Sequence, residues 1–194
     1  MPRRLQVIAA FAGTSPNQHV RLFCQDETRI GLHLPRYRRL TGRGVKPVVT
    51  EHPLYEYYWL YGAVEPATGE SFFLEMPWLN GDGFAVFLGE LSKAYPTSLN
   101  VVIVDNAGAH VARHVVVPEN VVLLPLPSYS PDLNPAERLW LDLKRHIDVT
   151  IQAVRENLVA LRNHVAERLC SYTAEQMQSL TGYQYLVDAV AALG

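Results

Sequence analysis

The chain has 194 residues, of which 48% are hydrophobic and 19% are charged, and its formal net charge is −2. These values are typical of one globular domain and exclude a disordered chain. They also argue against binding to nucleic acid through overall positive charge, so any such contact has to use a local basic segment or metal ions. The two cysteines, Cys24 and Cys170, lie in apolar segments without metal-ligand spacing, which predicts reduced core residues of a cytoplasmic protein.

The N-terminal segment, residues 1–19, is interpreted as a lead-in to the first strand. Its sequence MPRRLQVIAAFAG resembles a signal peptide only loosely, because the apolar stretch is about seven residues long. No other segment approaches the roughly 18 apolar residues that a membrane span requires. We therefore expect no membrane partner.

The first half of the chain predicts strands. Residues 20–25 form an apolar run, and 30–34 is predicted to pair with it across a short turn. Residues 35–50 are basic and contain glycine and proline, which is typical of a loop or an extended hairpin. Two further strands are predicted at 55–64, rich in aromatic residues, and at 71–76, on either side of a turn.

The middle of the chain alternates helices and buried strands. Asp82 is predicted to cap a helix with one apolar face, made of Phe84, Phe87, Leu88, Leu91 and Tyr95. The unbroken apolar run 99–104 predicts a strand buried on both sides, and 121–124 predicts another. A short helix is expected at 107–113, and a proline-rich loop at 125–131.

The C-terminal part predicts helices. Asn134 and Pro135 are typical of a helix start, and that helix is expected to end near Ile147. A second helix has apolar residues at a spacing of three or four, namely Ile151, Val154, Leu158, Leu161, Val165 and Leu169. TAEQ, residues 173–176, is a capping box for another short helix. The order of elements predicts an α/β fold in which helices pack on a mixed sheet.

Three acidic residues stand at the ends of these elements. Asp26 and Asp105 each follow an apolar strand, and Glu137 opens the helix that begins after Asn134. Carboxylates from separate elements that meet in one cleft suit Mg²⁺ or Mn²⁺, which prefer hard oxygen ligands. Taken singly, the two aspartates also fit a turn or a helix cap, and Glu137 also fits a capping-box glutamate. Spacing alone leaves these alternatives open.

The segments around the three acids resemble a known family. QDETRIGL (25–32), DNAGAH (105–110) and SYSPDLNPAERLW (128–140) are similar, in this order, to signature segments of DDE transposases, and most similar to the bacterial insertion-sequence branch of the mariner superfamily. The resemblance implies a ribonuclease H-like fold, with a mixed five-stranded sheet flanked by helices. It also implies that Asp26, Asp105 and Glu137 are the catalytic triad, that they bind two Mg²⁺ or Mn²⁺ ions, and that the substrate is DNA at transposon ends and at a target site. The implied reaction is hydrolysis and transesterification of phosphodiester bonds.

The resemblance also divides the chain. Residues 20–147 are expected to form the DDE catalytic core, and 148–194 to form C-terminal helices that pack on it. Members of the family normally begin with helix-turn-helix modules that bind the transposon ends, and only about 20 residues precede the first strand here. The 31 residues between Asp105 and Glu137 are also slightly fewer than usual. We therefore expect no separate end-binding domain in this chain, and we expect the modules in another polypeptide, unless the chain is a fragment or a decayed copy.

Secondary candidates surround the triad. Glu27, Asn106 and His110 are predicted to assist the metal site, with a solvated side chain or a helix start as the alternative. A basic run with interleaved tyrosine and glycine suits contact with phosphates, and Lys144 extends it; the predicted DNA-binding residues are Arg36, Arg38, Arg39, Arg43, Lys46 and Lys144. A solvated hairpin is the alternative for this run. The remaining expectations are a homodimer and a bacterial cytoplasmic location, associated with the nucleoid when bound to DNA.

Two rival functions stay open at this stage. The first is another nuclease on the same fold, acting on RNA or branched DNA with the same acids. The second is a non-catalytic, transposon-derived remnant that binds DNA or a partner transposase. A small-molecule hydrolase is disfavoured, because the sequence has no nucleophile elbow, phosphate-binding glycine loop or Cys/His pair.

Overall fold

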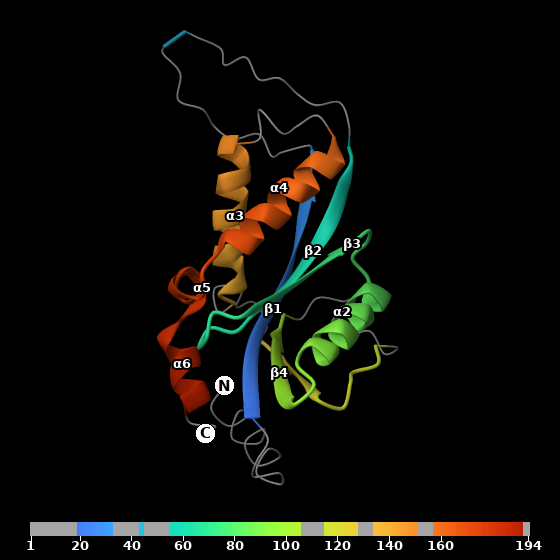
Figure 1. Ribbon diagram of the computed structural model, residues 1–194, viewed down its shortest axis with the longest axis vertical. Coiled ribbons are helices and arrows are strands. Elements are labelled where there is room, and N and C mark those ends of the chain that lie inside the picture. Colours follow the sequence, from blue (N-terminus) through green and yellow to red (C-terminus); the bar gives the residue numbers. More distant parts are fainter. Residues whose placement is uncertain are drawn as a thin grey trace.

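A computed structural model describes residues 19–32, 43–44, 55–105, 115–127, 134–150 and 157–191, without the side chains of 148–150 and 189–191. Five strands form one mixed sheet in the order β3-β2-β1-β4-β5. Their bounds are His19–Gly31 for β1, Tyr57–Val64 for β2, Ser71–Met76 for β3, Ser98–Val104 for β4 and Val121–Pro125 for β5. The prediction of a mixed five-stranded sheet flanked by helices is confirmed (Figure 1).

β1 organises the sheet because it pairs with different neighbours along its length. Its first half runs parallel to β4, from His19 opposite Ser98 to Cys24 opposite Ile103. Its second half runs antiparallel to β2, from Cys24 opposite Val64 to Gly31 opposite Tyr57. β4 ends at Val104, while β1 continues beyond it. The end of β4 therefore meets the middle of β1.

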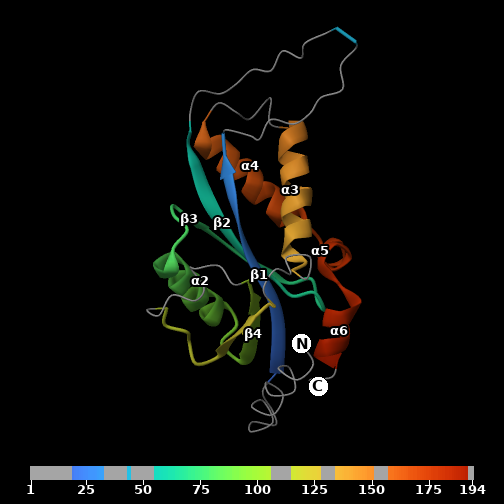
Figure 2. The same ribbon diagram turned by 180° about the vertical axis from the view of Figure 1, so that it is seen from behind.

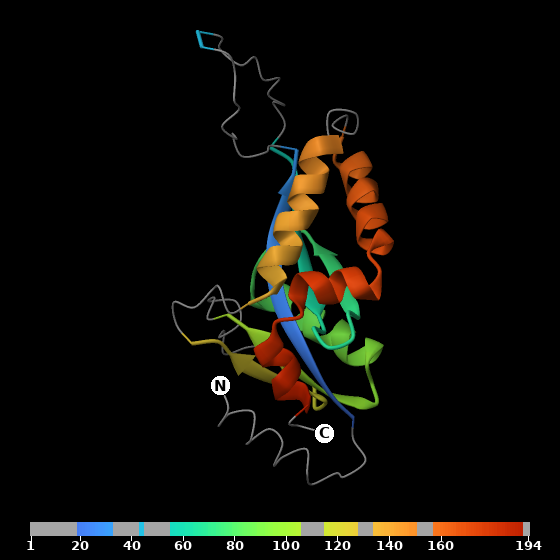
Figure 3. The ribbon, with the colours of Figure 1, turned by 90° about the vertical axis from the view of Figure 1, so that its left-hand side faces the viewer.

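Helix α2, Gly81–Ala94, covers one face of the sheet. Its apolar side, with Phe84, Phe87, Leu88 and Leu91, packs on odd-numbered residues of β1 and β2 such as Phe23 and Tyr61. The other face is covered by α3 (Ala136–Thr150), α4 (Leu158–Ser171), α5 (Ala174–Thr181) and α6 (Gln184–Ala191), as Figures 1 and 3 show. None of the helices in the described part of the chain is both long enough and apolar enough to cross a membrane.

Several predictions of local structure need correction. Residues 20–25 and 30–34 are not two strands, because β1 is one strand through the polar residues 26–29, whose backbone groups pair with β2. The cap of α2 is Asn80, not Asp82, since the side-chain oxygen of Asn80 accepts a hydrogen bond from the backbone N–H of Gly83 at 2.8 Å. α6 lies in the segment expected to form C-terminal helices, but its own bounds were not predicted.

The prediction that both cysteines are core residues is half right. Cys24 is fully buried, and burial raises the pKa of its thiol, whereas Cys170 is exposed on α4. The capping box of α5 is confirmed, with reciprocal bonds between Thr173 and Gln176. The expected helix at 107–113 and the expected helical positions Ile151 and Val154 lie outside the described residues.

Candidate active site

Asp26 lies in the middle of β1, on the face that α3 covers. Side chains alternate along a strand, so Asp26 shares a face with the buried residues Leu22 and Cys24 and with Ile30. Its cross-strand partner on β2 is Gly62. The Asp26 carboxylate is half-buried and accepts a hydrogen bond from the indole N–H of Trp140, with 3.0 Å between Nε1 and Oδ2.

Asp105 directly follows β4 and is half-buried. Cys24 pairs with Ile103 in the parallel ladder, and both belong to the same apolar cluster. Asp26 and Asp105 each lie two residues beyond this pair, and adjacent strands are about 4.8 Å apart, so a continuation of the register would place the two residues near each other. The negative charge of Asp105 indeed acts on Asp26, whose pKa it raises.

Glu137 stands in the first turn of α3 and is exposed to solvent. The start of this helix is fixed to β1 by the buried side chain of Asn134. The Nδ2 group of Asn134 donates to the backbone carbonyl of Gln25 at 2.8 Å, while its Oδ1 accepts from the backbone N–H of Ala136 at 3.1 Å. One side chain thus caps α3 and ties it to the residue before Asp26. Figure 2 shows this end of α3 close to the middle of β1.

The electrostatics of Asp26 reflect this convergence. Burial is the largest cause that raises the pKa of Asp26, to about 7, and the negative charges of Glu27, Asp105 and Glu137 raise it further. A hydrogen bond from the backbone N–H of Glu27 acts in the opposite direction. The charges that perturb Asp26 in the described part of the chain are therefore all negative. A carboxylate in such a setting is stabilised by an added cation.

Carboxylate oxygens are the ligands that hard divalent cations prefer. The three carboxylates come from three separate elements: β1, the residue after β4 and the first turn of α3. In the described residues, no three His, Cys, Asp or Glu side chains are gathered closely enough to hold an ion among them. The three acids are thus near neighbours without forming a closed coordination shell. The segments 106–114 and 128–133, which flank two of them, lie outside the described residues.

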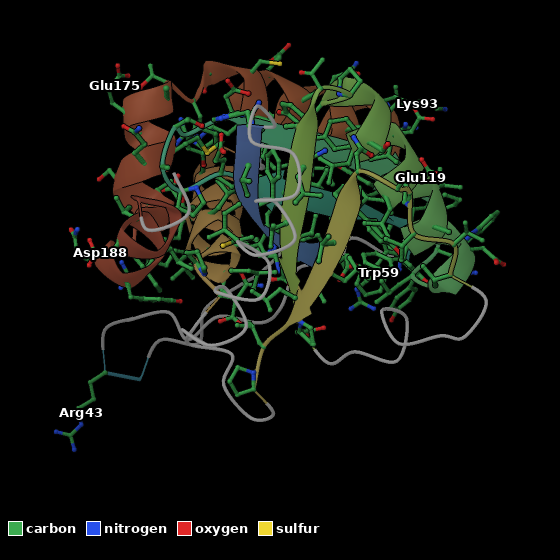
Figure 4. The ribbon with its side chains drawn as sticks, turned by 90° about the horizontal axis from the view of Figure 1, so that it is seen from below. Arg43, Trp59, Lys93, Glu119, Glu175 and Asp188 are labelled. Carbon is green, nitrogen blue, oxygen red and sulfur yellow. The ribbon has the colours of Figure 1, made fainter. Side chains whose placement is uncertain are left out.

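The secondary candidates are distributed differently. Glu27 follows Asp26 on β1, so its side chain is directed to the α2 face, where its Oε1 accepts from Nε2 of Gln25 at 2.9 Å. Lys144 lies on α3, half-buried, and Arg43 is exposed and stands apart from the sheet and helices in Figure 4. The other predicted accessory and DNA-binding residues lie outside the described part of the chain: Asn106, His110, Arg36, Arg38, Arg39 and Lys46.

Sequence reasoning missed two residues of this site, Trp140 and Gly62. Trp140 follows Glu137 by three positions, so both lie on the same side of α3, and its ring fills the space above Gly62. The spacing ExxW was visible in the sequence. The position of Gly62 opposite Asp26 was not, because it depends on the register of β1 and β2.

Comparison with known proteins agrees with this geometry. A family model described as DDE superfamily endonuclease matches residues 21–157. A protein of Sinorhizobium fredii (strain NBRC 101917 / NGR234), named uncharacterized protein y4pE/y4sA, is 35% identical over 83 residues, which are 42% of this chain and 62% of that protein.

Solved structures of Mos1 transposase have a similar fold. The Mos1 strand transfer complex gives a TM-score of 0.65 at 17% identity, over 100% of this chain and 60% of that chain. The Mos1 paired-end complex with the left transposon end gives 0.62 at 16% identity, over 100% and 61%. The Mos1 mariner paired-end complex with Mn gives 0.59 at 17% identity, over 100% and 61%.

The chain therefore spans about three-fifths of the length of these relatives. At such low identity, the likeness to Mos1 establishes the fold alone. The family match covers most of the chain and includes Asp26, Asp105 and Glu137. This chain belongs to the DDE superfamily of endonucleases and has their ribonuclease H-like fold.

Proposed function

We propose that this chain is the catalytic domain of a DDE transposase, which cuts DNA at transposon ends and joins it to a target. One observation carries the proposal: Asp26, Asp105 and Glu137 come from three separate elements, and Asp105 and Glu137 lie near enough to Asp26 that their charges add to burial in raising the pKa of Asp26. Membership of the DDE superfamily supports the same reading. In this proposal, residues 20–147 are the catalytic core, and residues 148–194 contribute helices that cover one face of the sheet.

The three carboxylates would hold two Mg²⁺ or Mn²⁺ ions. Bound there, the ions would activate the attacking water or hydroxyl and stabilise the leaving oxygen of a phosphodiester. Mos1 structures with Mn and with Mg support the choice of metal by analogy. The chain itself would supply position: β1 and β4 hold two aspartates at adjacent places in the sheet, and the Asn134 contact with Gln25 holds Glu137 above them.

A cleavage assay tests this proposal. The chain is incubated with supercoiled plasmid and Mn²⁺, and nicked product is compared for the wild type, Glu137→Gln and Glu119→Gln. Glu119 is an exposed acid in the turn before β5 and controls for the loss of one surface charge. We expect Glu137→Gln to abolish slow, weakly sequence-selective nicking, and Glu119→Gln to nick as the wild type does. If Glu137→Gln nicks DNA at the wild-type rate, Glu137 has no catalytic role and serves only as a helix cap.

The alternative of a non-catalytic remnant is an outcome of the same assay. If the wild type fails to nick DNA even with an added end-binding helix-turn-helix polypeptide, the remnant reading replaces the enzyme. Such a polypeptide, and a homodimer that pairs two transposon ends, belong to the proposal as partners.

The DNA contact is proposed to use the basic run, Lys144 and the metal ions. The positive charges would neutralise phosphates, and each lost phosphate contact lowers the slope of log affinity against log salt by about 0.9 on duplex DNA. Changing Arg38, Arg39 and Arg43 to alanine should therefore weaken binding and flatten this slope, measured by fluorescence anisotropy over a salt series. An unchanged slope would mean that the run does not contact DNA.

A further inference from the structure

We propose that Trp140 is a positioning residue of this site. Its indole N–H fixes the Asp26 carboxylate and the first turn of α3 relative to each other, so that Asp26 and Glu137 are oriented for the same divalent cation. The inference rests on the proposed function, because it assigns Trp140 a role in metal binding at that site.

The contact links the two elements that carry these acids. Trp140 is 5% exposed, and its Nε1 lies 3.0 Å from Oδ2 of Asp26, across 114 positions of sequence. Glu137 precedes Trp140 by one turn of the same helix. Any tilt of α3 that moves Glu137 away from Asp26 therefore also strains or breaks this hydrogen bond.

The sheet leaves space for the indole ring of Trp140 at Gly62. Gly62 pairs with Asp26 on one side and with Phe73 on the other, so these three residues form a row on the α3 face. A Cβ atom at Gly62 would lie 2.5 Å from Cη2 of Trp140 and 2.9 Å from Cζ2. Phe73 meets the Trp140 ring edge-on, with centroids 6.1 Å apart. Gly62 thus leaves room for the indole beside the carboxylate that it contacts.

An indole N–H is a suitable donor to a carboxylate that is to bind a metal ion. An indole N–H is neutral and only donates, so it orients a carboxylate without cancelling its charge. An arginine in the same place would orient Asp26 but would also compete with the cation. The bond to Oδ2 leaves the carboxylate further lone pairs for an ion. Hydrogen-bonding partners of metal ligands typically change metal affinity by 10- to 100-fold when they are removed.

Isothermal titration with Mn²⁺ on the full chain tests the proposal, with thermal unfolding as a second readout. Trp140→Phe keeps an aromatic ring over Gly62 but loses the N–H, and it should bind Mn²⁺ about 10-fold more weakly. Gly62→Ala keeps the N–H but displaces the ring, and it should weaken binding in the same direction. Ile147→Val is the matched control, because Ile147 lies on α3 in the same apolar cluster as Trp140, seven residues further from Glu137 along the helix. It should lower the midpoint of unfolding while leaving Mn²⁺ affinity unchanged.

The outcomes separate the two proposals. Wild-type Mn²⁺ affinity in Trp140→Phe overturns the positioning role while leaving the metal site intact. An equal loss of affinity in Ile147→Val overturns it too, because general packing would then explain the effect. If the wild type binds no Mn²⁺, the proposed function itself fails, and the positioning role falls with it. If Gly62→Ala does not fold, the comparison of Trp140→Phe with Ile147→Val still decides.

Discussion

β1 contributes residues to two acidic sites whose electrostatic surroundings are opposite. Near its start, Arg21 binds Glu65, which is 2% exposed, and also binds the exposed Glu70, while the Thr68 hydroxyl donates to Glu65. Near its middle, Asp26 accepts hydrogen bonds from two neutral donors, the indole N–H of Trp140 and the backbone N–H of Glu27, and the charges that perturb it in the described part of the chain are negative. The buried carboxylate of Glu65 is paired with a cation of the chain itself, whereas the described residues place no cation against the half-buried carboxylate of Asp26.

This difference suggests a structural role for the Glu65 site and a functional role for the Asp26 site. A buried carboxylate is costly unless it is paired, and Glu65 meets that requirement in the usual way. In the described part of the chain, no positive charge perturbs Asp26, while Asp105 and Glu137 add negative charge. We expect such an arrangement to destabilise the metal-free fold, and a bound cation to recover that free energy. The comparison therefore supports the proposal that the Asp26 site binds a cation.

The largest effect on stability should come from removing Arg21, the cation that pairs with Glu65. Arg21→Met leaves Glu65 buried without a positive partner, and loss of one member of a buried pair costs about 3–5 kcal/mol. Urea unfolding should show this loss. Arg162→Met is the matched control, because Arg162 pairs with Glu75 on the same sheet, but their side chains are 50% and 28% exposed. Exposed pairs contribute about 1 kcal/mol or less. Equal costs for the two variants would show that the Arg21 network is not structurally special.

A divalent cation should stabilise the Asp26 site to a similar degree. At a free Mn²⁺ concentration about 100 times its dissociation constant, binding adds about 2.7 kcal/mol to the free energy of unfolding. For a domain of this size, that raises the midpoint of thermal unfolding by about 5–10 °C. The shift should vanish on chelation with EDTA and should be small in Asp105→Ala. An equal shift in Asp105→Ala would remove Asp105 from the site.

Replacing Asp26 by asparagine should stabilise the metal-free protein at alkaline pH. The pKa of Asp26 is about 7 in the folded state and near 3.8 when unfolded, so between these values the folded state holds more protons. Stability that is present below pH 4 is therefore lost as the pH rises through 7. At pH 8, Asp26→Asn should exceed the wild type by about 2 kcal/mol, roughly half of what such a shift represents, because water screens a half-buried carboxyl.

The measurement is the difference in unfolding free energy between the two proteins, in EDTA, from pH 4 to pH 8. Titrating groups that do not interact with Asp26 cancel in this difference. A difference that does not grow with pH would mean that burial and the neighbouring acids do not disfavour the Asp26 charge. Saturating Mn²⁺ should reverse the order of stability at pH 8, because only the wild type binds the ion.

Much of this architecture was predictable from the sequence, for local reasons. The runs 71–76 and 99–104 are strands because their apolar residues fill a sheet, and α3 begins where Asn134 and Pro135 provide a cap and a fixed φ. The segments around Asp26, Asp105 and Glu137 carried the family resemblance, and the match to the DDE superfamily confirms it.

The rest depended on contacts between distant residues. The polar residues 26–29 resemble a turn, yet they continue β1, because β2 pairs with them. Trp140 reads as an ordinary apolar position on α3, and Gly62 as a weak point in a strand, until the register of β1 and β2 brings both to Asp26. The internal cation of Glu65 was equally hidden, since Arg21 reaches it across 44 positions of sequence.

The smallest effect on stability should come from removing the Thr68 hydroxyl, a neutral donor to Glu65, because Arg21 already supplies a positive charge to this carboxylate. Thr68→Val keeps the shape of the side chain but removes the hydroxyl, which donates to Glu65 and accepts from the exposed backbone N–H of Glu70 at 3.2 Å. A lost hydrogen bond to a charged group costs about 1.5–3 kcal/mol when its partner is left alone. Here Arg21 still binds both oxygens of Glu65, so the cost should be below about 1 kcal/mol. Urea unfolding of Thr68→Val, Arg21→Met and the double variant would show whether the hydroxyl matters more once the guanidinium is gone. A cost for Thr68→Val as large as that for Arg21→Met would mean that neutral donors suffice for a buried carboxylate in this fold, and the contrast between Glu65 and Asp26 would then lose its meaning.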